Sequence, residues 1–118
     1  MLFTVDKSKV EYIPHKREYD LWRSRLGDQQ HLEIMVELEK VLNEKKVVVS
    51  SFVPGKHWEN PYAYIYEACD HDEQNSAFFF GLLMWTAVQQ HADNWSFQKY
   101  DDSERDIKGM TYFKIEGI

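Results

Sequence analysis

The densest run of hydrophobic residues in the chain is the segment 76–91, SAFFFGLLMWTAVQQH. Asn75 or Ser76 can supply the side-chain oxygen that begins a helix, and Asp93 follows its end. At 100° per residue, the second half of the segment has one apolar and one polar face, whereas the first half is apolar on every side. We therefore expect a helix that the rest of the chain, or a partner, covers on two sides.

Three residues of the first half, Phe79, Leu82 and Leu83, lie where a surface helix would be polar. A symmetric dimer is the commonest way to bury such a patch when the chain does not bury it itself. We therefore predict a homo-oligomer with these residues at its interface. The apolar run falls short of the ~18 to 20 residues that a bilayer core requires, which excludes a membrane span.

Two further helices are predicted upstream. In the segment 16–26, Tyr19, Trp22 and Leu26 share one face before Gly27 ends the helix. The segment 28–45 has an apolar stripe formed by Ile34, Met35, Leu38, Val41 and Leu42. Its opposite face is charged and is interpreted as solvated, through Glu33, Glu37, Lys40 and Glu44.

The strands are predicted from β-branched and aromatic residues and from alternation. Segments 2–5 and 10–13 flank a polar turn. Segments 95–100 and 110–115 are predicted to form a hairpin around a polar connection. Segment 47–53 is expected to be a central strand. Segment 62–68 has tyrosines at alternate positions, which favours a strand paired with 47–53, although Asn60-Pro61 would also begin a helix well.

This order of elements predicts one α+β domain over residues 1–118, with a largely antiparallel sheet of about four to six strands and two to three helices packed on one face. Its core should bring together residues of the long helix, the 28–45 helix and the 47–53 strand: Leu38, Leu42, Val49, Phe52, Phe80, Met84, Trp85 and Val88.

Charge narrows the set of partners. The formal net charge is −6, which disfavours nucleic acid and anionic membranes because both require a basic surface. A basic protein partner remains compatible. The single cysteine, Cys69, excludes an internal disulfide, and the first ten residues contain no apolar signal core, so we expect a cytoplasmic protein.

The sequence contains none of the common nucleotide-binding, zinc-protease, esterase or zinc-ribbon motifs. Cys69 and His71 on one side of a strand could bind zinc together with His57, but this spacing matches no closed structural site. A Cys69 nucleophile is disfavoured because neighbouring acidic residues would raise its pKa. We therefore predict no metal, no cofactor and no catalytic residue.

Two groups of residues are candidates for binding. The loop 54–61 and the tyrosines after it combine contact area with polar tips, through His57, Trp58, Asn60, Tyr62 and Tyr64. Two acidic clusters could form a second surface, through Asp70, Asp72, Glu73, Asp101, Asp102 and Glu104. Plain packing on the sheet would also account for the aromatic residues, and solvated turns for the acidic ones.

These features favour a non-catalytic interaction module that binds a more basic protein, as inhibitors, immunity proteins and adaptors do. Short proteins of this kind are also carried on mobile gene cassettes. The alternative is a small-molecule binding domain or enzyme with a pocket between the long helix and the sheet. A partner whose binding weakens with salt would favour the first hypothesis, and an apolar cavity with a few polar groups would favour the second.

Overall fold

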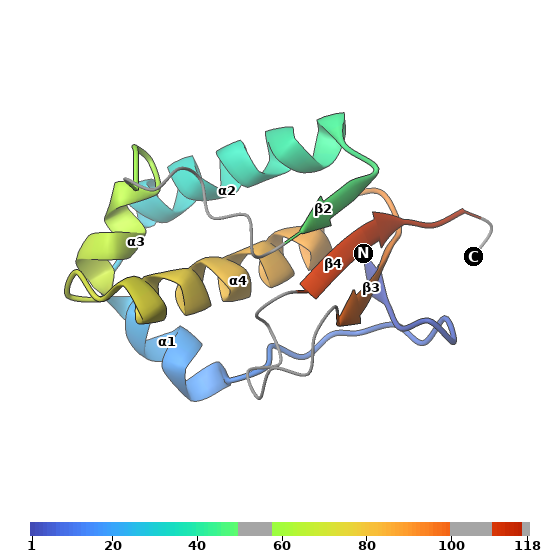
Figure 1. Ribbon diagram of the computed structural model, residues 1–118, viewed down its shortest axis with the longest axis horizontal. Helices are drawn as coiled ribbons and strands as arrows, with labels where there is room; N and C mark the ends of the chain where they lie inside the picture. The colour runs from blue at the N-terminus through green and yellow to red at the C-terminus, as the bar shows by residue number, and fades with distance from the viewer. Residues whose placement is uncertain (50–57, 100–109, 117–118) are drawn as a thin grey trace.

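The computed structural model describes residues 1–49, 58–99 and 110–116, and Figure 1 shows their α+β arrangement. This part of the chain contains, in order, β1 (Leu2–Phe3), α1 (Lys16–Ser24), α2 (Asp28–Glu44), β2 (Val47–Val49), α3 (Ala63–Ala68), α4 (Glu73–Gln90), β3 (Trp95–Lys99) and β4 (Met110–Lys114). The predicted fold class is confirmed, with four helices in the described ranges where two or three were expected.

The four strands form one mixed sheet in the order β1-β3-β4-β2. The β3 and β4 strands pair in antiparallel fashion, as do β4 and β2, whereas β1 runs parallel to β3. The predicted pairing of segments 95–100 and 110–115 is therefore confirmed over their described residues. The central position predicted for the 47–53 strand is wrong, because β4 takes that position and leaves β2 at the edge of the sheet.

The prediction of a strand over 62–68 is wrong, because residues 63–68 form the helix α3. Ile65, Ala68 and Cys69 are all buried, and their spacing of i, i+3, i+4 is that of one helix face. Burial of this face outweighs the β propensity of the tyrosines, which point to different neighbours. The predicted hairpin of 47–53 with 62–68 is therefore also wrong, and β2 pairs with β4 instead.

The predicted strand over 10–13 is wrong as well. The chain returns beside β1 only as far as an isolated bridge between Phe3 and Lys9 and a hydrogen bond from the Val10 amide to the Leu2 carbonyl, 2.8 Å long. Residues 11–13 form no strand, and the sheet continues from the other edge of β1, which pairs with β3.

Helix α4 runs through the middle of the molecule, with α2 alongside it, α1 and α3 near its N-terminal end and the sheet beside its C-terminal half (Figure 1). It begins one turn earlier than predicted, because the Asp72 carboxylate accepts a hydrogen bond from the Asn75 amide at 2.8 Å. Every residue from Phe79 to Val88 is buried. The Trp85 ring meets Phe97 of β3 and Tyr112 of β4 at centroid distances of 5.0 Å and 6.4 Å.

Six of the eight predicted core residues are buried: Leu38, Leu42, Phe80, Met84, Trp85 and Val88. The prediction that Val49 belongs to the core is wrong. Successive strand residues face opposite sides, and Val48 is the one that faces the helices. Val49 is 37% exposed on the outer side. Phe52 lies outside the described residues. No helix in the described ranges is long and apolar enough to cross a membrane.

Candidate functional site

The aromatic residues predicted at a hairpin tip lie at the start of α3 instead. Trp58 is buried, and its indole stacks on Tyr66 at 5.9 Å with an interplanar angle of 18°. Tyr66 in turn stacks on the exposed imidazole of His71 at 4.9 Å. Trp58 therefore packs inside the molecule rather than on the predicted contact surface. His57 lies outside the described residues.

Asn60 and Tyr64 line a groove of about 490 Å³ between α3 and the outer side of α2, which we call the α2–α3 groove. The opposite wall is formed by residues from two successive turns of α2, namely Leu32, Glu33, Val36 and Glu37. The structure thus brings two of the predicted binding residues together with a helix that the sequence places far from them. Tyr62, a third predicted residue, packs its ring edge-to-face against Phe80 at 5.8 Å.

Carboxylates of α2 lie close to Tyr64, which lines the groove, and to Tyr62, which does not. The negative charge of Glu33, together with a hydrogen bond from the Tyr64 hydroxyl to Glu33, raises the pKa of that hydroxyl. Burial raises the pKa of Tyr62, and the charge of Glu37 adds to the effect. Glu37 also accepts a hydrogen bond from Lys40, at 3.1 Å. Tyrosine is protonated at neutral pH even at its ordinary pKa, so the Tyr62 hydroxyl keeps a proton that it can donate, whereas the Tyr64 hydroxyl donates its proton to Glu33.

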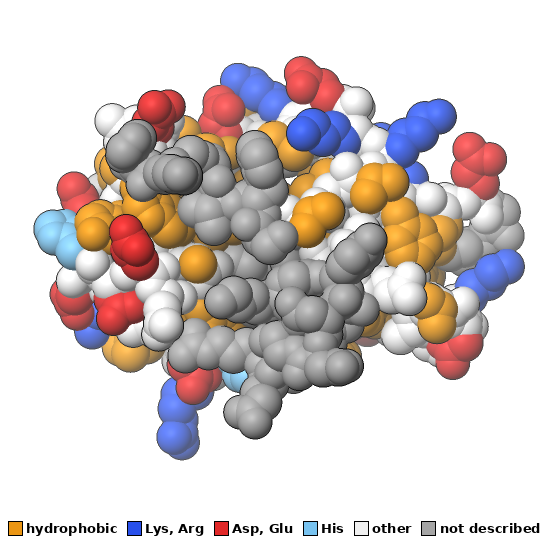
Figure 2. Space-filling view, in the orientation of Figure 1, with side chains coloured by type: hydrophobic (Ala, Val, Ile, Leu, Met, Phe, Trp, Pro, Cys, Tyr) orange, Lys and Arg blue, Asp and Glu red, His pale blue; other side chains and the backbone are white. Residues whose placement is uncertain are grey.

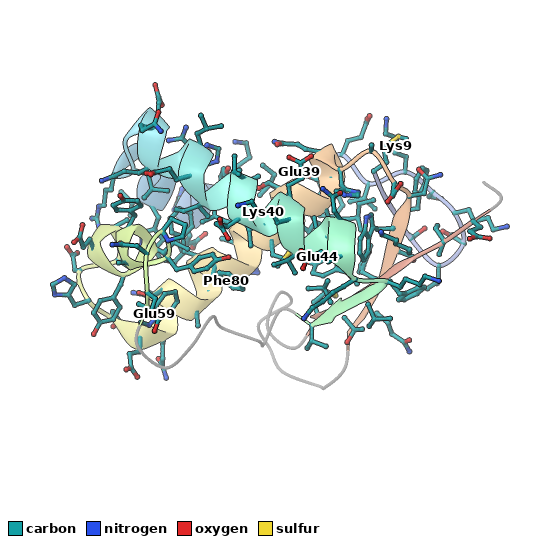
Figure 3. All side chains as sticks on the ribbon, turned by 90° about the horizontal axis from the view of Figure 1, so that it is seen from above. Lys9, Glu39, Lys40, Glu44, Glu59 and Phe80 are labelled. Atoms are coloured by element: carbon teal, nitrogen blue, oxygen red, sulfur yellow. The ribbon has the colours of Figure 1, made fainter. Side chains whose placement is uncertain are left out.

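Two apolar side chains separate this groove from a second hollow. Leu32 is 55% exposed and Val36 is 43% exposed, and each lines both depressions. The second hollow has a volume of about 230 Å³ and lies between α2 and the end of α4. Glu39 is among its lining residues, and Figure 3 shows Glu39 and Lys40 on α2. Leu32 and Val36 therefore form an exposed apolar ridge bordered by charged side chains.

The described part of the predicted acidic surface has structural roles. Asp70 forms an ion pair with Arg25 at 3.1 Å, which joins the turn after α3 to the end of α1. Asp72 caps α4, and Glu73 lies in its first turn, where negative charge is favourable. Asp101, Asp102 and Glu104 lie outside the described residues. Asp70 and Asp72 are therefore engaged within the chain, and the groove is the better candidate for binding.

Cys69 is buried, and burial raises the pKa of its thiol to about 12. At neutral pH it is therefore a thiol rather than the thiolate that nucleophilic or metal chemistry requires. In the residues that the structure describes, no group of three or more His, Cys, Asp or Glu side chains could hold a metal ion. Cys69 and His71 do not lie on a strand, because α3 ends at Ala68 and both follow it in a turn.

His91 has a structural role, because it connects both long helices to the sheet. Its ring Nε2 lies 2.7 Å from Oδ1 of Asn43, which fixes the proton on Nε2. Its Nδ1 accepts hydrogen bonds from the Asp93 amide at 3.1 Å and the Trp95 indole at 3.2 Å. Burial lowers the pKa of His91, while Asp93 opposes this shift and Lys114 adds to it. The folded state therefore holds a neutral imidazole here.

The prediction that three residues of α4 form an oligomer interface is wrong, because they are not on the surface. Phe79, Leu82 and Leu83 are fully buried inside the chain's own core. Trp22 of α1 packs on Phe79 with a centroid distance of 5.7 Å, so the chain itself covers the side of α4 that a partner was expected to cover.

Sequence reasoning treated Glu33 and Glu37 as members of a plain solvated face and did not select Leu32 or Val36. A usable signal is present, because Leu32 and Val36 are apolar yet lie outside the stripe that contains Ile34, Leu38 and Leu42. What the sequence could not supply is the opposite wall, which depends on the position of α3. No protein family model matches the sequence, and no curated protein or solved structure shows significant similarity to it.

Proposed function

We propose that this chain is a non-catalytic interaction module whose α2–α3 groove binds a basic segment of a protein partner. The observation that carries the proposal is the exposure of Leu32 and Val36 directly beside Glu33 and Glu37 in one groove. An apolar patch with a polar rim is the usual composition of a protein-binding surface.

Charge favours a basic partner. Helix α2 carries five carboxylates and one lysine, and the whole chain has a net charge of −6. Figure 2 shows charged side chains along the edge of the molecule formed by α2. A lysine or arginine side chain has an apolar stem and a charged head, which suits a groove with an apolar ridge next to Glu33.

The two kinds of contact have different roles. An exposed ion pair contributes only about 0.2 to 1 kcal/mol, so the carboxylates mainly select the partner and speed its approach. Most of the binding free energy is expected from apolar contact with Leu32 and Val36 and from Tyr64, since tyrosine is frequent among the residues that dominate interfaces.

The titratable groups favour binding over catalysis. Tyr62, Tyr64 and Cys69 are protonated at neutral pH at their ordinary pKa values, and their surroundings raise these pKa values further. A nucleophile or general base needs a pKa shifted toward neutrality, in the opposite direction from these groups. The Tyr64 hydroxyl, which donates its proton to Glu33, is well suited to accept a hydrogen bond from a backbone amide of a bound segment.

The proposal is tested with a short fluorescent peptide in which lysines and leucines are spaced to share one helix face, and with a peptide in which glutamate replaces each lysine. We expect the lysine peptide to bind, with an affinity that falls as salt is added, and the glutamate peptide not to bind. Fluorescence anisotropy measures both dissociation constants. Equal binding of the two peptides, or none by the lysine peptide at millimolar concentration, contradicts the proposal.

Two matched charge reversals on α2 separate the groove from general electrostatic attraction. Glu33→Lys and Glu44→Lys change the net charge equally, and both side chains are exposed, but only Glu33 lines the groove. Glu33→Lys should weaken the affinity for the lysine peptide by about tenfold or more. Glu44→Lys should weaken it by less than about threefold. Equal weakening by the two reversals would show that the groove is not the site.

A further inference from the structure

A separate cavity of about 330 Å³ lies on the other side of α2, where this helix, α4 and β2 come together. Its walls are mainly apolar and include Leu38, Val41, Val48, Phe80 and Met84, with Lys45 and Tyr62 as the two polar residues. Leu38, Phe80 and Met84 are buried, so the cavity reaches the core. In Figure 3, Phe80 extends from α4 into the space beside α2.

The size and lining of the cavity indicate the kind of molecule that fits. An apolar cavity of about 150 Å³ in a protein core stays dry and binds benzene. The present cavity is about twice as large, at about 330 Å³, which lies within the range of natural small-molecule sites. A cavity of this kind is more favourably filled by an apolar molecule than by water, because its walls offer water few hydrogen-bonding partners.

The walls favour an aromatic occupant. Phe80 and Tyr62 already pack edge-to-face, with an interplanar angle of 74°, so a third ring could extend the same arrangement. Met84 adds a polarizable sulfur, which contacts aromatic rings favourably. The Tyr62 hydroxyl remains protonated, as described above, and can donate one hydrogen bond to a polar atom of the occupant.

We propose that this cavity is a binding site for a small, uncharged aromatic molecule of about the size of indole. The proposal does not depend on the α2–α3 groove, because Val41 lines only the cavity and Val36 lines only the surface depressions. A phenylalanine at position 41 would place its ring in the cavity, whereas one at position 36 would enlarge the exposed ridge.

The test uses indole itself, with the full chain and two variants of α2, Val41→Phe and Val36→Phe. Indole should raise the melting temperature of the unmodified chain and of Val36→Phe by a few degrees, because it binds only the folded state. Calorimetric titration should show affinity at least about tenfold weaker for Val41→Phe. No stabilisation of the unmodified chain near the solubility limit of indole, or equal stabilisation of Val41→Phe, overturns the proposal.

A second measurement does not depend on how Val41→Phe folds. In the unmodified chain with methyl-labelled side chains, nuclear Overhauser effects should connect indole protons with the methyl group of Met84 and not with those of Val36. Effects at Val36 alone would place indole in the surface groove and overturn the proposal. Indole should not change the affinity for the lysine peptide, because the two are proposed to bind at different places. Failure of the indole proposal therefore leaves the peptide proposal standing, and the reverse also holds.

Discussion

Helices α2 and α4 have nearly the same length, 17 and 18 residues, but opposite surroundings. The side chains of α4 are buried without a break from Phe79 to Val88. In α2 only Ile34, Leu38 and Leu42 are fully buried. The difference shows that α4 serves the stability of the fold, whereas the outer side of α2 is available for binding.

The largest effect is expected at the centre of α4. Trp85→Ala removes a buried ring that meets both β3 and β4, and also the indole that donates a hydrogen bond to the Tyr12 carbonyl at 2.9 Å. It should lower the free energy of unfolding by about 3 to 5 kcal/mol, measured by urea denaturation. Leu32→Ala on α2 should change it by less than about 0.5 kcal/mol.

Trp85→Phe serves as the control for this substitution, since it keeps an aromatic ring and loses only part of the side chain. It should be clearly less destabilising than Trp85→Ala. If Trp85→Ala melts within a few degrees of the parent, or if Leu32→Ala destabilises as much, the contrast between the two helices is wrong.

A smaller effect is expected where the helices begin. Helix α4 has a side-chain cap at Asp72. The residue before α2 is Gly27, which has no capping side chain and whose amide donates a hydrogen bond to the Gln30 side chain at 3.0 Å. Asp72→Ala should cost about 0.5 to 2 kcal/mol, because the Asn75 amide loses its acceptor. Asp72→Ser, which keeps an acceptor, should restore most of the stability in the same thermal melts. A loss in Asp72→Ser as large as in Asp72→Ala would exclude capping as the cause.

The smallest effect is a pH dependence at the point where α2 and α4 meet. Burial lowers the pKa of His91 below its ordinary value of 6.5, so the unfolded chain binds a proton at a higher pH than the folded chain. The contribution of His91 should be complete above about pH 6.5 and decline as the pH falls toward the lowered pKa. Protonation of His91 at Nδ1 would place an N–H group against the Asp93 amide and the Trp95 indole, which are themselves hydrogen-bond donors.

Unfolding free energies at pH 8 and pH 5.5 measure this effect. The difference between the two values should shrink in His91→Gln. The pH dependence of His31→Gln is compared with that of His91→Gln. Burial lowers the pKa of His31 in the same direction, but His31 lies near the start of α2 and not where α2 and α4 meet. An unchanged difference in His91→Gln would show that His91 does not titrate as described.

The same contrast explains what could be predicted from the sequence. Helix α2 was predictable because its two faces have different compositions, and the β3–β4 hairpin because its strands are adjacent in the sequence. The N-terminal half of α4 has no polar face, so the sequence could not show whether its own chain or a partner covers Leu82 and Leu83. The structure assigns that role to the chain, because both residues are fully buried within it.

The site was less predictable than the fold. Asn60, Tyr62 and Tyr64 were selected for their side-chain chemistry, and Asn60 and Tyr64 do line a groove. The secondary structure predicted for them was wrong, a strand instead of helix α3. Tyrosines at alternate positions obscured the helical spacing of Ile65, Ala68 and Cys69. Glu33 and Leu32 line a groove only because α3 packs opposite them, and such long-range packing leaves no local pattern in the sequence.

The position of β4 has a consequence for how the protein is made. This strand lies between β3 and β2 and pairs with both, although it follows β2 by some sixty residues. During synthesis, β2 cannot pair with its neighbour until residues 110–114 have left the ribosome, and such distant contacts form slowly. The edges of β2 and β3 that β4 later covers stay open in the meantime. Until β4 emerges, these open strand edges expose the nascent chain to aggregation.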